Sequence, residues 1–234
     1  MKQIKTIAAK EFTDYFISPI AYIVIALFLI VTGWFFFSTF FIFKRADLRD
    51  FFSLLPMIFS FIIPAITMRL FSEEQNIGSY ETLLTMPVTF FDIVIGKFLA
   101  AICFTSSMLI PTLFYPIFIS FIGDLDPGPV IGGYIGSILL AGAFCSCGLF
   151  ASSLTRNQII AFITGCALCF TLTILDRLLF FMPEKIISAI EYISANSHFI
   201  NISKGIIDSR DIVYFISIIL VFIFSTYIVM HEKN

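Results

Sequence analysis

The chain has 234 residues, of which 59% are apolar and only 13% are charged, and its formal net charge is −2. This composition excludes an ordinary soluble domain, a disordered chain and a disulfide-stapled secreted module, and the lack of a basic surplus excludes a nucleic-acid-binding protein. The apolar residues, among them 31 phenylalanines, come in long runs. We therefore expect an all-α membrane protein in which residues 1–234 form one transmembrane domain.

The first 18 residues predict a helix that lies in the membrane interface. Ile4, Ile7 and Phe12 recur at helical spacing, while Lys10 falls on the other side. An apolar face opposite a basic face is typical of such helices. The pair Ser18-Pro19 is expected to end this helix and to turn the chain into the first span. The apolar run that follows is too long for a cleaved signal peptide, so we expect none.

Six later segments are apolar and long enough to span hydrocarbon, which takes about 20 residues each. They are predicted at 20–43, 51–70, 93–122, 130–154, 158–181 and 211–230. The third segment is longer than one span needs, and Pro111 and Pro116 inside it are expected to kink or break it. An even number of spans places both termini on the same side of the membrane.

The basic residues only partly decide which side that is. With both termini inside, seven lysines and arginines fall on each side of the membrane. The outer total depends on segment 176–210, which looks structured; without it the outer side keeps three. Because a basic N-terminal segment usually carries the most weight, we expect both termini in the cytoplasm.

The connection between spans two and three, 69–97, is longer than a bare turn requires. Gly78 is expected to break the chain, after which a short amphipathic helix begins at Ser79 and ends at Pro87. Such a helix could dock in a groove of a soluble partner, or it could simply lie on lipid. The residues of the docking surface would be Glu73, Glu74, Gly78, Ser79, Glu81, Leu83, Leu84 and Pro87.

Two further segments have unusual composition. Gly128, Gly132 and Gly136 repeat the G-x-x-x-G spacing, which lets helices approach closely, either within the chain or between subunits. Segment 182–210 is too apolar for a free loop and too polar to span, so we expect one or two helices at the outer face, as a lid or as a gate. The polar and aromatic residues singled out there are His198, Phe199, Lys204, Asp208 and Arg210.

No motif for catalysis, metal binding or nucleotide binding is recognisable. Gly96-Lys97 is the only Gly-Lys pair, and it lacks the remaining residues of a P-loop, so we expect no ATP site in this chain. Cys166 and Cys169 have no histidine or acid in their run and are expected to pack. Asp176 is expected to form an interfacial ion pair, although an intramembrane enzyme that uses Asp176 and His198 stays an alternative.

Three motifs, which occur in the right order along the chain, resemble those of the ABC-2 type transporter permeases. The stretch Glu73-Glu74-x-x-x-Gly78-Ser79-x-Glu81-x-Leu83-Leu84-x-x-Pro87-Val88, followed by Gly96-Lys97, is similar to the family signature. Two further motifs are similar to the gliding-motility branch of that family. The first is Lys10-Glu11-Phe12 with Ser18-Pro19-Ile20-Ala21-Tyr22, and the second is His198-Phe199, Ser203-Lys204-Gly205-Ile206-Ile207-Asp208, Arg210-Asp211 and Tyr214-Phe215.

The resemblance implies a specific architecture and a specific role. Residues 1–18 would be a cytoplasmic elbow helix, 73–92 would contain the coupling helix that docks on a separate ATPase, and the segment before span six would form re-entrant helices. Two permease chains, identical or different, would assemble with two ATPase subunits, which bind ATP and Mg. The complex would be an exporter in the bacterial cytoplasmic (inner) membrane, surrounded by lipid, and its substrate does not follow. A non-transporting membrane scaffold is the other alternative.

Overall fold

The computed structural model describes residues 2–43, 47–78, 89–178, 192–206 and 208–232, and the regular structure of these residues is all helical. Six helical stretches are long and apolar enough to cross a membrane, which confirms the predicted all-α fold with six spans. The helices are α1 (Lys2–Ile17), α2 (Pro19–Phe43), α3 (Arg49–Thr67), α4 (Arg69–Ile77), α6 (Phe90–Leu109), η1 (Ile110–Leu113), α7 (Phe114–Ser120), α8 (Pro127–Leu154), α9 (Gln158–Leu178), α11 (Ala195–Ser203) and α12 (Ser209–Glu232).

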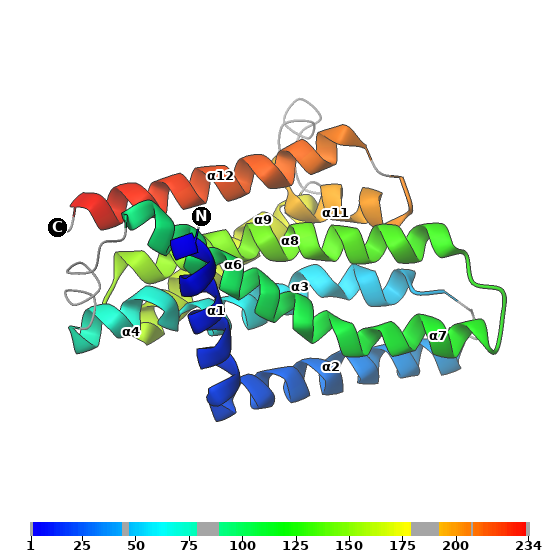
Figure 1. Ribbon diagram of the computed structural model, residues 1–234. Helices are drawn as coiled ribbons and strands as arrows, with labels where there is room; N and C mark the ends of the chain where they lie inside the picture. The colour runs from blue at the N-terminus through cyan, green and yellow to red at the C-terminus, as the bar shows by residue number, and fades with distance from the viewer. Residues whose placement is uncertain (1, 44–46, 79–88, 179–191, 207, 233–234) are drawn as a thin grey trace.

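The N-terminal helix α1 crosses the direction of the long helices at a steep angle (Figure 1). It ends at Ile17, and α2 begins at Pro19, so the predicted break at Ser18-Pro19 is confirmed. Proline suits the first position of a helix, because its fixed φ matches the helix and the amide hydrogen that it lacks would be unpaired there anyway. The interfacial position of α1 stays a prediction.

The second span is longer than the sequence predicted. α3 is followed at once by α4, which continues to Ile77 and ends at Gly78 in the left-handed conformation, with φ of 77°. Glycine adopts this conformation without a steric penalty, so the predicted break at Gly78 is confirmed. The predicted helix from Ser79 to Pro87, including Glu81, Leu83 and Leu84, lies outside the described residues.

The third span begins and breaks at identifiable residues. At its start Thr89 and Asp92 form a capping box, in which each side chain accepts a hydrogen bond from the other's backbone N–H. The helix α6 gives way to the 3₁₀ turn η1, which contains Pro111, so the expected interruption is confirmed. Pro116 lies in the first turn of α7, where a helix tolerates proline.

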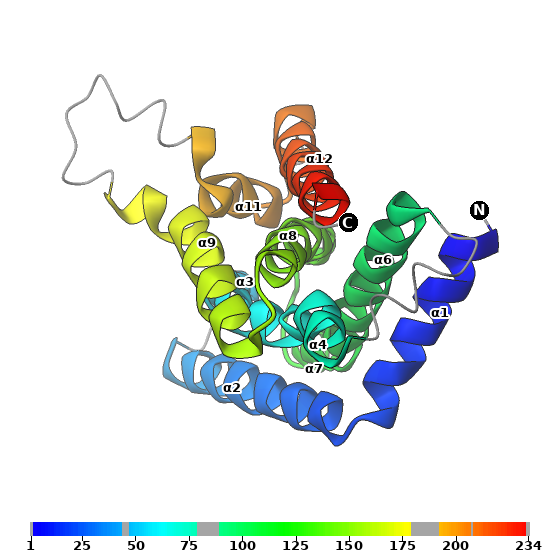
Figure 2. The same cartoon turned by 90° about the vertical axis from the view of Figure 1, so that its left-hand side faces the viewer.

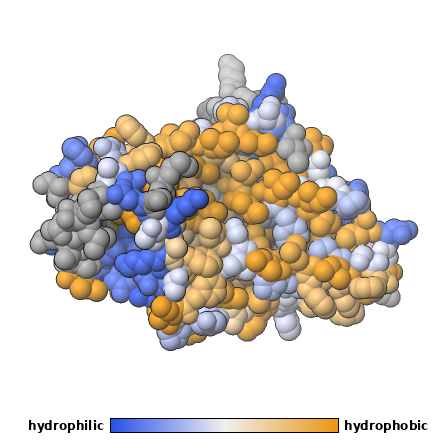
Figure 3. All heavy atoms as spheres, viewed as in Figure 1, coloured by the Kyte–Doolittle hydropathy of each residue, from blue (hydrophilic) through white to orange (hydrophobic). Residues whose placement is uncertain are grey.

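The helix α8 is the centre of the bundle. Figure 2 shows it surrounded by α12, α6, α4, α3, α9 and α11. In its most apolar stretch 78% of the residues are buried, against 22% in α9 and α12 and 28% in α2. The helices α2, α9 and α12 therefore expose much of their apolar surface on the outside of the bundle. On the face that Figure 3 shows, hydrophobic side chains form a band over the middle of the molecule and hydrophilic side chains gather toward the ends, as a protein that spans a bilayer requires.

Candidate functional site

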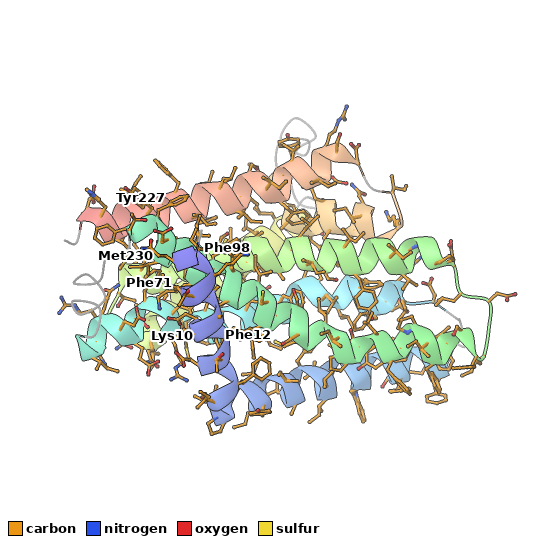
Figure 4. All side chains as sticks on the ribbon, viewed as in Figure 1. Lys10, Phe12, Phe71, Phe98, Tyr227 and Met230 are labelled. Atoms are coloured by element: carbon orange, nitrogen blue, oxygen red, sulfur yellow. The ribbon has the colours of Figure 1, made fainter. Side chains whose placement is uncertain are left out.

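The candidate site lies where α1, α4 and α6 meet, at the end of the bundle that carries both termini (Figure 1). The helices α4 and α6 are the described elements on either side of residues 79–88, where the sequence predicts the docking helix. Figure 4 labels Lys10 and Phe12 on α1, Phe71 on α4 and Phe98 on α6 in this region.

A buried lysine ties the three helices together. The Nζ atom of Lys97, on α6, lies 2.6 Å from Oε1 of Glu74 on α4 and 2.9 Å from Oε1 of Glu11 on α1. The side chain of Lys97 is 1% exposed, while those of Glu11 and Glu74 are 13% and 16% exposed. The ring of Phe71 lies 5.4 Å from the same ammonium. The cation is thus held by two carboxylates and an aromatic face.

Burying the charge of Lys97 costs free energy unless both carboxylates, Glu11 and Glu74, are present. Removing a lysine from water is expensive, and only close opposite charges with hydrogen bonds offset the cost. Here one positive charge faces two negative charges, so the cluster carries one excess negative charge. The second carboxylate oxygen of Glu74, Oε2, is buried and has no hydrogen-bond partner among the residues that the structure describes.

The approach of α1 to α6 depends on a glycine beside the lysine. A Cβ atom added at Gly96 would lie 2.7 Å from Cγ2 of Ile7. Real Cβ contacts are not this short, so a larger residue would push α1 away from α6. Gly96 therefore allows α1 to approach α6 closely, and this approach brings Glu11 within reach of Lys97.

The junction between α3 and α4 is anchored to the central helix by Ser152 of α8. Its Oγ accepts hydrogen bonds from the backbone N–H groups of Phe71 and Ser72, both at 3.0 Å, and donates one to the carbonyl of Met68 at 2.8 Å. One buried hydroxyl thus satisfies three backbone groups at the point where α3 passes into α4. As a result, α4 is fixed to α8 at its start and to α6 through Lys97.

Two more contacts hold this end together. Arg69 donates two hydrogen bonds to Glu73, of 2.7 and 3.1 Å, in a bidentate pair one turn apart on α4. The hydroxyl of Tyr15, on α1, donates to the carbonyl of Ile66 on α3 at 3.3 Å. Burial around this hydroxyl raises the pKa of Tyr15 well above its usual value. The phenol therefore stays protonated and able to donate.

The predicted docking residues fall into two groups. Glu73 pairs with Arg69, Glu74 turns toward Lys97, and Gly78 ends α4. The other five, Ser79, Glu81, Leu83, Leu84 and Pro87, lie outside the described residues. Their docking role stays a prediction.

Sequence reasoning did not single out the role of Lys97. The available signal was a lysine inside a predicted span, since charges in apolar segments need partners.

The predicted outer residues lie at the opposite end of the bundle. Nδ1 of His198 lies 2.6 Å from a carboxylate oxygen of Asp211, and Nε2 lies 3.1 Å from the carbonyl of Tyr192. The ring of Tyr214 stacks on the imidazole at 4.1 Å. Asp176 instead accepts a hydrogen bond from Asn196. The two residues of the enzyme alternative therefore have separate partners.

The remaining outer residues have structural contacts. Phe199 is buried against Gly136, Lys204 follows the end of α11, and Asp208 accepts a hydrogen bond of 3.0 Å from the backbone N–H of Arg210 at the start of α12. The short helix α11 is described, whereas residues 179–191, where the rest of the predicted lid would lie, are not.

The glycines of α8 make room for α11 within the same chain. A Cβ atom at Gly132 would lie 2.4 Å from the carbonyl oxygen of Ile202, and one at Gly136 would lie 3.1 Å from the Ile202 side chain. Gly128 lies against Gly205 at the end of α11. The close approach thus occurs between helices of one subunit.

Among the residues that the structure describes, no three histidine, cysteine, aspartate or glutamate side chains are grouped closely enough to hold a metal ion. The contacts at the α1–α4–α6 end join these three helices to one another through Lys97.

Comparison with protein families gives a match over nearly the whole chain. The family model described as ABC-2 family transporter protein matches residues 5–233. A search of curated proteins finds no match. The assignment to the gliding-motility branch stays a prediction.

Proposed function

Because the chain belongs to the ABC-2 family of transporter proteins, we propose that it is the permease subunit of an ATP-driven exporter. Family membership makes it a multi-pass membrane transporter subunit, a transmembrane component with no catalytic role of its own. In the proposal, a separate ATPase subunit hydrolyses ATP, and this chain converts the resulting motion into movement of a substrate out across the cytoplasmic membrane.

The proposed complex contains two ATPase subunits and a second permease chain, which is either a copy of this one or a related chain. ATP and Mg bind to the ATPase subunits. The absence of a P-loop from this sequence supports that division of labour, since Gly96-Lys97 lacks the glycine-rich segment that cradles phosphates. Both termini lie on the cytoplasmic side, where the ATPase would dock.

The observation that carries the coupling role is the Lys97 ion-pair network. ATP binding closes the ATPase pair, and the closure displaces the docking segment between α4 and α6. Since Lys97 joins α6 to Glu74 on α4 and to Glu11 on α1, the displacement reaches three helices together. Ser152 passes it on to α8, the central helix. The path for the substrate opens between the two permease chains.

The test is recovery of an ATPase with the affinity-tagged permease from its native membranes. We expect a P-loop ATPase, identified by its peptide sequences, to co-purify with the wild-type chain. Glu81→Lys and Leu84→Asp, which alter the predicted docking helix, are expected to reduce its recovery about tenfold, the effect of roughly 1.4 kcal/mol of lost contact energy. Asp124→Lys, at the other end of the bundle, is the matched charge control.

Membrane insertion must stay intact for the test to be informative. We expect both docking variants to elute as the wild type does in size-exclusion chromatography, and to fail to stimulate ATP hydrolysis when reconstituted with the ATPase. Unchanged ATPase recovery from both variants would overturn the docking role of 79–88.

A further inference from the structure

A pocket of about 320 Å³ opens in the angle between α1 and the first two spans. Its walls come from α1, α2, α3, α4 and α6, which are the three helices of the candidate site together with α2 and α3. Charged and apolar side chains both line it, and we refer to the charged lining residues as the rim and to the apolar ones as the floor. Such a division is typical of a site at a membrane interface, where an occupant has a polar head and an apolar tail.

The charges of the rim are unbalanced. Four carboxylates and two cations line it: Glu11, Asp14, Glu73 and Glu74 against Lys10 and Arg69. Counting the nearby Lys97 still leaves one excess negative charge. The rim therefore disfavours an anionic head group and favours one that carries an ammonium.

One acceptor in this rim is unsatisfied. Glu74 lines the pocket, and its buried Oε2 atom has no hydrogen-bond partner within the described part of the chain, while its Oε1 atom accepts a hydrogen bond from Lys97. A buried carboxylate oxygen without a donor is costly. A ligand that brings N–H groups into the pocket would remove that cost.

The floor matches a hydrocarbon chain. It is formed by Ala21, Val24, Ala65 and Ile66 at the facing sides of the first two spans. Ile20 and Ile77, which also line the pocket, are 46% and 71% exposed, so exposed apolar surface adjoins the floor.

We propose that this pocket binds one phospholipid with a primary ammonium in its head group, namely phosphatidylethanolamine. The ammonium donates to Glu74, the phosphate lies toward Lys10 and Arg69, and an acyl chain covers the apolar floor. A trimethylammonium head group has no N–H to donate, so phosphatidylcholine does not satisfy Glu74. The proposal concerns a bound membrane component and does not depend on the transported substrate or on the ATPase.

The experiment uses the full-length chain reconstituted in vesicles of equal parts phosphatidylethanolamine, phosphatidylcholine and phosphatidylglycerol. After extraction in mild detergent, native mass spectrometry counts the lipids that stay bound. We expect one phosphatidylethanolamine per chain, enriched about tenfold over each of the others, the effect of one charge-assisted hydrogen bond. Equal retention of the three lipids would indicate nonspecific association and would overturn the proposal. A preference for phosphatidylglycerol would overturn it as well.

A pocket-filling variant tests the location without changing the ion pairs. Ala65→Leu adds volume to the floor and is expected to abolish the enrichment. Ala167→Leu, at an exposed position on α9, is the matched control and is expected to keep it. Enrichment that survives Ala65→Leu in a monodisperse protein would place the lipid elsewhere and overturn the proposal.

Two further measurements use the wild-type chain alone. Successive methylation of the head-group nitrogen is expected to lower retention stepwise, because each methyl group removes a donor. Millimolar glycerophosphoethanolamine, which has the head group without the acyl chains, is expected to leave the bound lipid in place. Efficient displacement by this soluble molecule would show that the acyl chains do not contribute to binding, and it would overturn the proposal that the pocket binds a lipid.

Discussion

Lys97 shows how far the role of one residue depends on segments distant from it in sequence. Its partners are 86 and 23 residues away, on α1 and α4. Local sequence indicated only a charge near the start of a span. It also suggested that Glu74 faces a partner protein, whereas the fold turns this side chain inward. The direction of a side chain depends on which helices pack around it, and spacing along one helix does not reveal that.

The first prediction concerns the loss of this cation. Lys97→Met keeps the apolar stem but leaves Glu11 and Glu74 close together with no positive charge between them. We expect a destabilisation of about 3–5 kcal/mol, the usual effect of removing one partner of a buried ion pair. Thermal unfolding in detergent measures it. The control is Lys204→Met at an exposed lysine, where we expect a change within about 0.5 kcal/mol. Equal behaviour of the two variants would contradict the network.

A second prediction concerns His198 at the opposite end. Its two ring nitrogens lie within hydrogen-bond distance of the Asp211 carboxylate and the Tyr192 carbonyl, so the ring of α11 is connected to the start of α12. Asp211→Asn replaces the carboxylate with a neutral amide, which forms a weaker hydrogen bond to the ring. We expect faster hydrogen exchange in α11, because α11 and α12 are joined through this pair.

The comparison for this variant is Asp208→Asn, three residues earlier. Asp208 accepts from a backbone N–H at the start of α12, and asparagine caps helices about as well as aspartate. Hydrogen exchange in α11 should therefore match the wild type. If Asp208→Asn loosened α11 as much as Asp211→Asn, the effect would not belong to the histidine pair.

At the scale of the helices, the local break signals were readable and the packing was not. Ser18-Pro19, Gly78 and Pro111 all act through their own backbone, so the sequence placed these breaks correctly. The extension of the second span through α4 escaped prediction because its charged residues are neutralised inside the fold. The G-x-x-x-G spacing predicted a close contact but left its partner open, and the structure identifies α11.

The third prediction separates two glycines of that repeat. At Gly132 a new Cβ atom would lie 2.4 Å from a backbone carbonyl of α11, whereas at Gly128 it would lie 3.4 Å from the movable side chain of Asp126. We expect Gly132→Ala to cost about 1–3 kcal/mol through overpacking, and Gly128→Ala to cost much less. Parallel unfolding measurements decide it. A larger loss at Gly128 would mean that α11 does not pack on α8 as described.

At the scale of the whole molecule, the sequence predicted the number of spans but only weakly their orientation. The long apolar runs are a local property, so counting them was reliable. The charge count was a tie because segment 176–210 combines basic residues with helical structure, and α11 now accounts for part of that segment. Both chain ends lie toward the end of the bundle that carries the Lys97 network (Figure 1).

The fourth prediction tests this orientation. A fluorescent reporter that folds only in the cytoplasm, fused after Asn234, is expected to be active, and alkaline phosphatase, which folds only outside, is expected to be inactive there. The same two reporters inserted after Asp124, between α7 and α8, should give the opposite result. Identical results at the two positions would place them on the same side of the membrane and would contradict the three spans, α8, α9 and α12, that lie between them.

The Lys97 network also has a consequence for how the chain enters the membrane during synthesis. Chains are made from the N-terminus, so Glu11 and Glu74 leave the ribosome before Lys97 does. Glu11 lies ahead of the first span and Glu74 lies near the end of the second, while Lys97 enters with the third. Its counter-charges have therefore already emerged when Lys97 does, so the ion-pair network can form without waiting for α8.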